Sequence, residues 1–260
     1  MQIGRPGPLT TSISTADAHS ITVREKDLCS EVMGQMSFTE YFYLLVTGDT
    51  PTEDQRFFLD LLLNAIAEHG LVPTNQVARM TYAAAPDAIQ GAVAAGILGC
   101  GSVVLGTAEE CGKFLEYART RLDATAESPE QAMASLLEDL KATGGKAPGF
   151  GHPLHKPVDP RARRILELAE TRGVAGLHCA MAKAAEARVP EVWGKPLPMN
   201  VSMAIAAVLL DLGFPKAMLK AIPILARTGS LLAHLNEEST TPIGFTMAAK
   251  AESAVSYEAK

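Results

Sequence analysis

Apolar residues recur about every three to four positions along most of this 260-residue chain, the spacing that gathers them on one face of an α-helix. Several of these segments begin at a capping residue, such as Ser128, whose hydroxyl can pair with Gln131 in a capping box. Only residues 12–23 alternate apolar and polar side chains around a turn, the pattern of a β-hairpin. The predicted fold class is therefore all-α with a short N-terminal β-hairpin. Helices are expected over residues 38–46, 52–69, 75–82, 87–98, 108–122, 129–143, 160–172, 174–187, 199–212, 215–221 and 223–238.

The most apolar run, residues 92–106, is rich in glycine and shorter than the roughly 20 residues that cross a bilayer. We therefore expect it to be a buried helix, and its small residues, like those of residues 199–212, suit close packing between helices and between subunits. A formal net charge of −6 argues against nucleic acid or an anionic membrane as a partner. The four cysteines show no CxxC spacing, and the first residues lack the apolar core of a signal peptide, so a cytoplasmic location is expected.

The segment KAPGFGHPLHKPVDPR, residues 146–161, carries the strongest local signal for a functional site. Gly149 and Gly151 allow a tight turn whose backbone amides can face a ligand. Pro153 restricts His152 to extended backbone geometry, which would hold its side chain in one place. On composition alone, a glycine- and proline-rich surface loop with an incidental histidine is the simpler interpretation.

The sequence GFGHPLHKPVDPR resembles the GxGHxxxxxxDPR signature of the citrate synthase family. The resemblance extends along the chain in the order and spacing of that family. Residues 37–53 resemble the SFxEVxYLLxxGxLPT segment of that family, and residues 67–69 resemble its A-D-H element. Residues 200–202 resemble its N-V-D element, and residues 226–234 resemble its A-R-x-x-G-x-x-A-H helix. The length of the chain is closer to stand-alone citryl-CoA lyases, and to the lyase module of ATP-citrate lyase, than to full citrate synthases.

The resemblance implies which residues would form the site. In that family the glycine loop wraps coenzyme A, its histidine polarises a carbonyl or hydroxyl of the substrate, and the DPR arginine pairs with a carboxylate. It also implies a homodimer, with a large domain of residues 1–107 and 213–260 and a small domain of residues 108–212. The implied residues are His152, His69 and Ser202 for catalysis, Arg161, Arg227 and Asn200 for substrate binding, and Lys146, Gly149, Phe150, Gly151 and Lys156 for coenzyme A.

Three departures from the family pattern bear on function. Ser102 stands about where citrate synthases have a catalytic histidine. Lyase-type members of the family lack that histidine, as this chain does, so a synthase is disfavoured. Ser202 replaces the aspartate of N-V-D, and a hydroxyl cannot serve as an acid and base without an activating neighbour; Glu237 or Glu238 is a candidate replacement. No arginine follows Arg227, although family members usually supply a late one across the dimer.

Other interpretations remain open for single residues. His69 lies at a helix end, where a histidine often serves only as a favourable charge. Arg227 lies among apolar residues and needs either an internal salt bridge or a substrate carboxylate. His234 is expected to be a core histidine, and His155 could contact a coenzyme A phosphate.

The predicted function is cleavage of citryl-CoA to acetyl-CoA and oxaloacetate by retro-aldol (Claisen) chemistry. Its substrates would be small acyl-CoA thioesters and carboxylates. The chain shows no metal-ligand cluster and no redox-cofactor fingerprint, so coenzyme A is the only expected cofactor. The alternatives are a lyase or synthase for another β-hydroxy acyl-CoA, or a homologue that binds acyl-CoA without turning it over.

Overall fold

The computed structural model describes residues 9–125 and 127–259. Residues 1–8, at the start of the expected large domain, and residue 126, in the expected small domain, lie outside the described residues. The chain divides into two compact units, Met1–Asp60 and Leu61–Lys260. The expected division into a large and a small domain at residues 107 and 213 stays a prediction.

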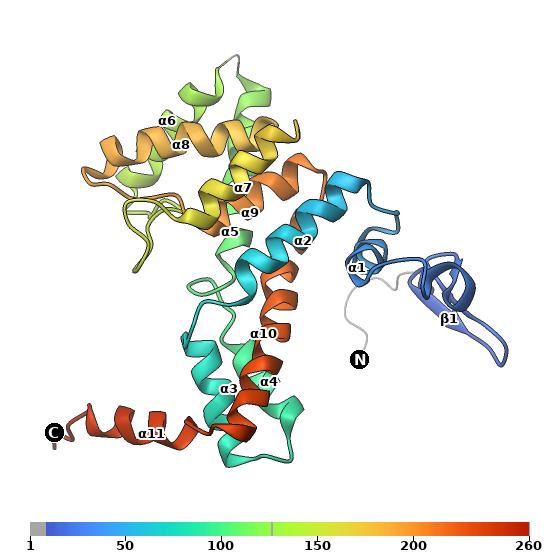
Figure 1. Ribbon diagram of the computed structural model, residues 1–260. Coiled ribbons are helices and arrows are strands. Elements are labelled where there is room, and N and C mark those ends of the chain that lie inside the picture. Colours follow the sequence, from blue (N-terminus) through green and yellow to red (C-terminus); the bar gives the residue numbers. More distant parts are fainter. Residues whose placement is uncertain (1–8, 126, 260) are drawn as a thin grey trace. The chain divides into compact units, whose positions relative to one another are not determined.

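The first unit contains a small antiparallel sheet in the order β1-β2-β3. Figure 1 labels its first strand. The predicted hairpin is confirmed as the β1–β2 pair. The third strand was missed because the turn before it needs left-handed backbone at Arg24 and Glu25, residues that rarely adopt it. The elements of this unit are β1 (Ser14–Ala16), β2 (Ile21–Val23), β3 (Lys26–Asp27), the π-helical turn η1 (Leu28–Val32), α1 (Phe38–Thr47) and the start of α2 (Glu53–Ala67).

The second unit is built from helices. They are α3 (Pro73–Ala84), α4 (Ile89–Leu98), α5 (Thr107–Ala124), α6 (Pro129–Ala142), α7 (Pro160–Thr171), α8 (Leu177–Trp193), α9 (Val201–Asp211), the 3-10 turn η2 (Lys216–Met218), α10 (Ala221–Thr240) and α11 (Gly244–Ser253). The predicted all-α fold is confirmed. No helix within residues 9–125 and 127–259 has the length and apolar character that crossing a membrane requires.

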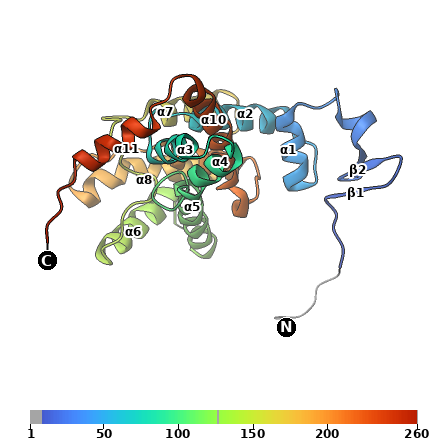
Figure 2. The same ribbon diagram turned by 90° about the horizontal axis from the view of Figure 1, so that it is seen from below.

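Helix α9 is the most buried element of this unit. Every residue from Val201 to Leu209 is buried, and the helix packs against α5, α7 and α8. A second group consists of α3, α4 and α10, which Figures 1 and 2 show together, and of α11, which packs against α3 and extends away from the others. Its core includes Ala78 of α3, Ala92 of α4 and Leu231 of α10. The pocket described below is lined by loops and helix ends from both groups.

The expectation of one buried helix over residues 92–106 is wrong beyond Leu98, where α4 ends. The Leu98 side chain is 86% exposed and that of Val103 is 87% exposed. Close packing between helices is confirmed at α4, because a Cβ at Gly96 would lie 2.7 Å from the side chain of Leu231 on α10. Glycines that follow Leu98 turn the chain into a loop, so apolar composition alone misidentified this segment.

Other helix boundaries depend on side chains that lie outside the helix itself. Helix α8 runs to Trp193 through Pro190, beyond the expected end at residue 187. Its start is capped by Asp211, which accepts backbone N–H groups from three residues near Gly176. The start of α11, which was not expected, is held by Glu238 in the same way. The expected helix at residues 215–221 is only the short turn η2.

Candidate functional site

One pocket in the second unit contains every residue predicted for catalysis or substrate binding. Its volume is about 330 Å³, and it lies between the turn after α2, the α4–α5 loop, the glycine loop and the starts of α7 and α9, with α10 beside them. Apolar side chains form much of its wall, and no carboxylate is among its lining residues. The predicted residues that line it are His69, Gly151, His152, Arg161, Asn200, Ser202 and Arg227.

The glycine loop is held by backbone pairing with the segment before α9. Gly149 (φ +77°) and Gly151 (φ +90°) both adopt left-handed backbone. The Asn200 N–H donates to the Gly149 carbonyl (2.9 Å), and the Gly151 N–H donates to the Pro198 carbonyl (2.7 Å). A Cβ at Gly149 would lie 2.7 Å from the Met203 Cβ, so this position requires glycine.

The predicted exposure of loop amides to a ligand is wrong for two of them. The N–H of Gly151 is used by Pro198, and the N–H of Phe150 donates to the Ala147 carbonyl (3.4 Å). Phe150 is half-buried, whereas Lys146 and Lys156 are exposed and do not line the pocket. The roles of Lys146, Gly149, Phe150, Gly151 and Lys156 in binding coenzyme A therefore stay predictions.

His152 has a fixed proton arrangement. Its Nδ1 accepts the backbone N–H of Leu154 (3.1 Å) and of His155 (3.0 Å). An imidazole that accepts at Nδ1 carries its hydrogen on Nε2 when it is neutral. Burial, together with the nearby His155, lowers the pKa of His152. The ring is therefore neutral near pH 7 and presents an Nε2–H donor, which suits an oxygen atom of a substrate.

His69 forms a pair with His155. The Nε2 atoms of the two rings lie 3.0 Å apart, and the His155 ring stacks on that of His152 with centroids 4.4 Å apart. The turn that carries His69 is held by Glu68, whose carboxylate accepts the N–H of His69 (2.9 Å) and of Gly70 (2.6 Å). Burial and the charge of Arg161 lower the pKa of His69, which favours the neutral ring.

Arg161 is fixed by its neighbour Asp159, which also caps α7. The Asp159 carboxylate accepts Nε (3.1 Å) and Nη2 (2.9 Å) of Arg161. Although burial opposes ionisation of Asp159, hydrogen bonds and the charge of Arg161 hold its pKa below the ordinary value. Among the described residues, Nη1 of Arg161 makes no hydrogen bond, so this edge of the guanidinium is open to a ligand that lies in the pocket.

Arg227 is buried, with only 2% of its surface exposed, and lines the pocket. Its Nη1 donates to Oδ1 of Asn75 (2.8 Å), but its Nε has no hydrogen-bond partner within residues 9–125 and 127–259. No ion pair to Arg227 occurs in the part of the chain that the structure describes. Burial lowers its pKa, but an arginine keeps its charge in a protein. The internal salt bridge is thus not formed, and a ligand carboxylate would supply the counter-charge.

Asn200 and Ser202 lie at the start of α9. The Asn200 side chain caps this helix by accepting the Ser202 N–H (3.0 Å) and donates to the Gly151 carbonyl (3.2 Å). Its amide therefore joins the glycine loop to α9, and its expected contact with substrate stays a prediction. The Ser202 hydroxyl is hydrogen-bonded to the Thr107 hydroxyl at 2.6 Å. Two neutral hydroxyls thus occupy the place where the family pattern has an aspartate.

The structure gives no support to Glu237 or Glu238 as a replacement carboxylate. Arg79 pairs with both, through a 2.7 Å contact from its Nε to Glu238 Oε2 and a contact from its Nη1 to Glu237. Neither glutamate lines the pocket. His234 is half-buried and bonded to Glu68 through Nε2 (3.0 Å), which agrees with a structural histidine.

Sequence reasoning missed four residues of the site and its supports. Thr107 is 95 positions from its partner Ser202, and Asn75 is 152 positions from its partner Arg227. Glu68 was visible only as part of the A-D-H resemblance, and His155 only as a possible phosphate contact. The one signal that could have drawn attention to His155 is its distance of three residues from His152 in a constrained loop.

Among the described residues, the same three histidines are also candidates for binding a metal ion. One ring nitrogen from each of His69, His152 and His155 lies within 4.8 Å of the others. A metal ligand must offer a lone pair. The Nδ1 lone pair of His152 is already taken by two backbone N–H groups, and its Nε2 carries hydrogen. The residues present therefore fit an oxygen ligand better than a metal ion.

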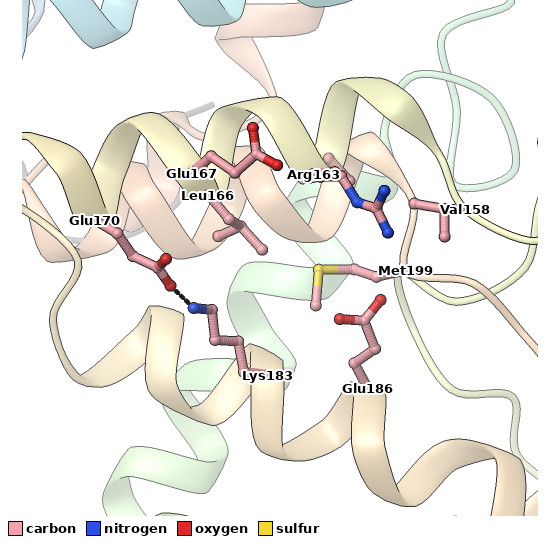
Figure 3. Close-up of a pocket in the computed structure, with 9 residues that line it drawn as sticks. Val158, Arg163, Leu166, Glu167, Glu170, Lys183, Glu186 and Met199 are labelled. Atoms are coloured by element: carbon pink, nitrogen blue, oxygen red, sulfur yellow. Dashed lines mark ion pairs between the residues drawn. The ribbon is translucent and has the colours of Figure 1, made fainter.

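A second pocket, of about 200 Å³, lies between α7 and α8 (Figure 3). Its charged side chains are exposed, and Lys183 pairs with Glu170 across it. None of the predicted catalytic or substrate-binding residues lines it. Since its charged groups are already solvated or paired, it offers little to a ligand, and the histidine pocket is the better candidate site.

The fold and the pocket define an all-α protein whose site suits an anionic, oxygen-rich small molecule. The family described as "Citrate synthase, C-terminal domain" matches residues 9–243, and the chain therefore belongs to the citrate synthase family. The citrate synthase of Heyndrickxia coagulans is 28% identical over 226 residues, which cover 85% of this chain and 57% of that protein. The citrate synthase of Saccharolobus solfataricus is 27% identical, with 52% of its length covered. The chain thus spans about half the length of the curated relatives it matches.

Solved structures match over nearly the whole chain. The citryl-CoA lyase from Hydrogenobacter thermophilus gives a TM-score of 0.85 at 28% identity and covers 98% of this chain and 96% of that chain. The ATP citrate lyase from Methanothrix soehngenii, in complex with citrate and coenzyme A, gives a TM-score of 0.77 at 21% identity over 92% of this chain and 40% of that chain. At that identity the second likeness shows the fold alone.

Proposed function

We propose that this protein is a citryl-CoA lyase-like enzyme that cleaves citryl-CoA to acetyl-CoA and oxaloacetate. The observation that carries the proposal is a single pocket in which a neutral His152 donor lies with Arg227, a buried cation without an ion pair among the described residues. Such a site can hold a hydroxyl or carbonyl oxygen and a carboxylate of one ligand. The structural likeness to the Hydrogenobacter citryl-CoA lyase, at a TM-score of 0.85 and 28% identity, supports a lyase rather than a synthase.

The reaction is a retro-aldol cleavage. The substrate hydroxyl loses its proton, its oxygen becomes the carbonyl of oxaloacetate, and the electrons of the broken carbon–carbon bond pass into the thioester enolate. His152 donates its Nε2–H to that oxygen and stabilises the charge that develops on it. His69 receives the hydroxyl proton. Arg161 and Arg227 hold carboxylates so that the breaking bond aligns with the enolate π system. Lys146, Gly149, Phe150, Gly151 and Lys156 bind coenzyme A.

The enolate carbon must then take up a proton. A carboxylate does this poorly unless its pKa is near the working pH, and a hydroxyl does it only through water. Ser202 is already hydrogen-bonded to Thr107 (2.6 Å), so the two hydroxyls together can position a water molecule at the enolate carbon. The same pair favours the second candidate, a lyase or synthase for another β-hydroxy acyl-CoA, because no carboxylate lines the pocket.

Restoring the family carboxylate distinguishes these candidates. If citryl-CoA is the substrate, Ser202→Asp should raise the rate of acetyl-CoA release, since a carboxylate beside Thr107 can exchange a proton with the enolate carbon. Ser202→Ala is the matched control and should lower the rate or leave it unchanged. The measurement is acetyl-CoA release from citryl-CoA at equal coenzyme A saturation.

A panel of β-hydroxy acyl-CoA thioesters, assayed beside direct binding of coenzyme A, tests the proposal as a whole. Cleavage of citryl-CoA above background by the wild type supports it. Turnover of a different thioester, with none of citryl-CoA, favours the second candidate. Coenzyme A binding with no turnover of any thioester, and no gain in Ser202→Asp, leaves an acyl-CoA-binding homologue.

The remaining expectations belong to the same proposal. The active form is a cytoplasmic homodimer, in which the domain of residues 108–212 closes over the substrate against the domain of residues 1–107 and 213–260. The enzyme needs no metal or redox cofactor, because cleavage and protonation move only protons and the electrons of the substrate itself. No nucleic acid or membrane is required as a partner.

A further inference from the structure

His155 contacts both histidines of the pocket in two different ways. Its backbone N–H donates to Nδ1 of His152 (3.0 Å), and its ring Nε2 lies 3.0 Å from Nε2 of His69. The rings of His155 and His69 are nearly perpendicular, at 79°, with centroids 5.2 Å apart. Two neutral imidazole nitrogens at this distance share one hydrogen, so one ring donates and the other accepts.

The nitrogen that His69 can offer a substrate is Nδ1. Within residues 9–125 and 127–259, this atom makes no hydrogen bond, whereas Nε2 is engaged with His155. If Nε2 of His69 carries the shared hydrogen, then Nδ1 has a free lone pair and can accept a proton. His69 lines the pocket, whereas half-buried His155 does not, so the pair runs from the pocket wall outward.

The charges around His69 make a lasting positive charge on it unfavourable. Arg161 and His152 face it from the start of α7 and from the glycine loop, and burial with the charge of Arg161 lowers its pKa. Asp159 acts in the opposite sense but is already bonded to Arg161, and Glu68 is bonded to the turn that carries His69. A base in this position works best if the proton that it accepts can leave.

We infer that His155 is the proton-exchange partner of His69. As the substrate O–H bond breaks, an Nδ1–H bond forms on His69, and the Nε2 hydrogen of His69 passes to Nε2 of His155. His155 then releases its Nδ1 hydrogen to water, which leaves both rings neutral. The step moves one proton outward and needs no oxidant or reductant. This inference rests on the proposed function. His155 does not touch the substrate, so it is a positioning residue that acts through His69.

The kinetic test replaces His155 with Gln, which can still hydrogen-bond but cannot carry a proton. We expect kcat for thioester cleavage to fall roughly tenfold to hundredfold, up to the lower limit of the about 10²–10⁴-fold contributed by general acid–base catalysis, because the base itself, His69, is retained. KM and the Kd for coenzyme A should stay within about threefold. His19→Gln, in the exposed hairpin of the first unit, is the matched control and should keep full activity.

Chemical rescue separates proton exchange from a structural role. In His155→Ala, added imidazole should restore part of kcat in proportion to its concentration, because a small base can take the vacated position. A variant that keeps wild-type kcat across pH 5.5–8.5 overturns the inference. So does a variant whose only defect is a raised KM that imidazole does not change.

A second measurement does not depend on turnover. Nitrogen-15 NMR of the histidine rings should show the His69 and His155 signals moving together as the first proton is taken up, as coupled sites do. In His155→Gln, the His69 signals should titrate alone and at a different pH. If the wild type cleaves no thioester, the proposed function fails, yet coupled titration would still support the pair. Independent titration of the two rings in the wild type overturns the inference even in an active enzyme.

Discussion

Arg227 carries a buried charge whose counter-charge is missing from the described residues. It is 2% exposed, and among the described residues it holds one hydrogen bond, to Asn75, while its Nε has no partner. A protein keeps such a group at a cost in free energy of unfolding. At this residue, stability and ligand binding are therefore expected to oppose each other.

Replacing Arg227 with Met should separate these two effects. We expect the affinity for the carboxylate substrate to fall roughly tenfold to hundredfold, in line with the about 1.5–3 kcal/mol contributed by hydrogen bonds to charged groups. The midpoint of urea unfolding without ligand should stay the same or rise, because the desolvated charge is gone. Arg164→Met, at a side chain that is 65% exposed, is the control and should change neither quantity. A marked loss of stability with unchanged affinity would show that Arg227 is only structural.

His152 should be required for turnover but not for coenzyme binding. His152→Ala is expected to abolish cleavage and leave the Kd of coenzyme A within a few fold, since the glycine loop is held by its own pairing with residues 198–200. An unchanged turnover rate in the variant would contradict the site assignment.

The lowered pKa of His152 also indicates how turnover should depend on pH. The folded-state pKa of His152 lies below its ordinary value of 6.5, so the neutral ring is present at pH 7 and is lost only as the pH falls through the lowered pKa. Turnover should therefore be constant from about pH 7 down to about pH 6.5, the ordinary pKa of histidine, and should decrease at lower pH. A wild-type rate that rises as the pH falls from 7 to 5 would be incompatible with a neutral His152.

At the scale of elements, three helices of the second unit meet at one histidine. His178, near the start of α8, bonds through Nδ1 to Asp211 of α9 (2.8 Å) and through Nε2 to Glu116 of α5 (3.0 Å). Although burial opposes its charge, hydrogen bonds to Asp211 and Glu116 raise the pKa of His178 above 6.5. The charged ring therefore joins two carboxylates, and the packing of α5, α8 and α9 depends on its protonation.

The sign of the pH effect follows from this shift. Because the folded-state pKa is raised, the stabilisation by His178 is fully present below the unfolded-state value near 6.5 and is lost as the pH rises through the raised pKa. The pKa values of Asp211 and Glu116 are lowered, so their contribution is lost in acid, below their ordinary values of 3.8 and 4.5. Urea midpoints measured from pH 5 to 9 should decline at the alkaline end for the wild type. His178→Gln should lack that decline, and equal slopes for both proteins would contradict the assignment.

The existence of most helices followed from apolar spacing, but their ends did not. Helix α8 begins where Asp211 caps it from α9, and α11 begins where Glu238 accepts the N–H of Gly244. The first cap joins residues 35 positions apart, which no local window contains, whereas the second spans only six positions. The prediction of a buried helix at residues 92–106 was wrong for the opposite reason. Local composition suggested burial, but the glycines that follow Leu98 end α4 there.

For the site, too, the sequence predicts some features and not others. The motifs correctly predicted that His69, His152, Arg161 and Arg227 would line one pocket. The partner of Arg227 comes from elsewhere in the fold, since Asn75 is 152 positions away, whereas the partners that orient His152 and Arg161 lie within three residues of them. A resemblance identifies residues that bear chemistry, whereas tautomers, orphaned charges and hydroxyl pairs emerge only once the chain is folded.

At the scale of the molecule, the burial of α9 bears on how two copies of the chain would form the expected homodimer. Residues 199–212 suited close packing between subunits, but α9 is buried within its own unit by α5, α7 and α8. Large apolar side chains do remain exposed elsewhere, including Leu98 (86%) of α4 and Phe245 (67%) of α11. Exposed apolar groups of this size are typical of surfaces that bind a partner when they are contiguous.

We therefore predict a homodimer whose contact includes α11 rather than α9. Sedimentation at low micromolar concentration should report a dimer for the wild type. Phe245→Asp should shift the protein toward monomer, because a charge placed in an apolar contact loses its hydration without gaining a partner. Lys250→Glu, on the same helix, is the matched control for a change of charge and should remain dimeric. Neither substitution removes Glu238 or Arg79, which anchor α11, so a change in assembly is not expected to reflect loss of the helix. A wild type that sediments as a stable, active monomer would contradict the prediction, and a dimeric Phe245→Asp would place the contact elsewhere on the surface.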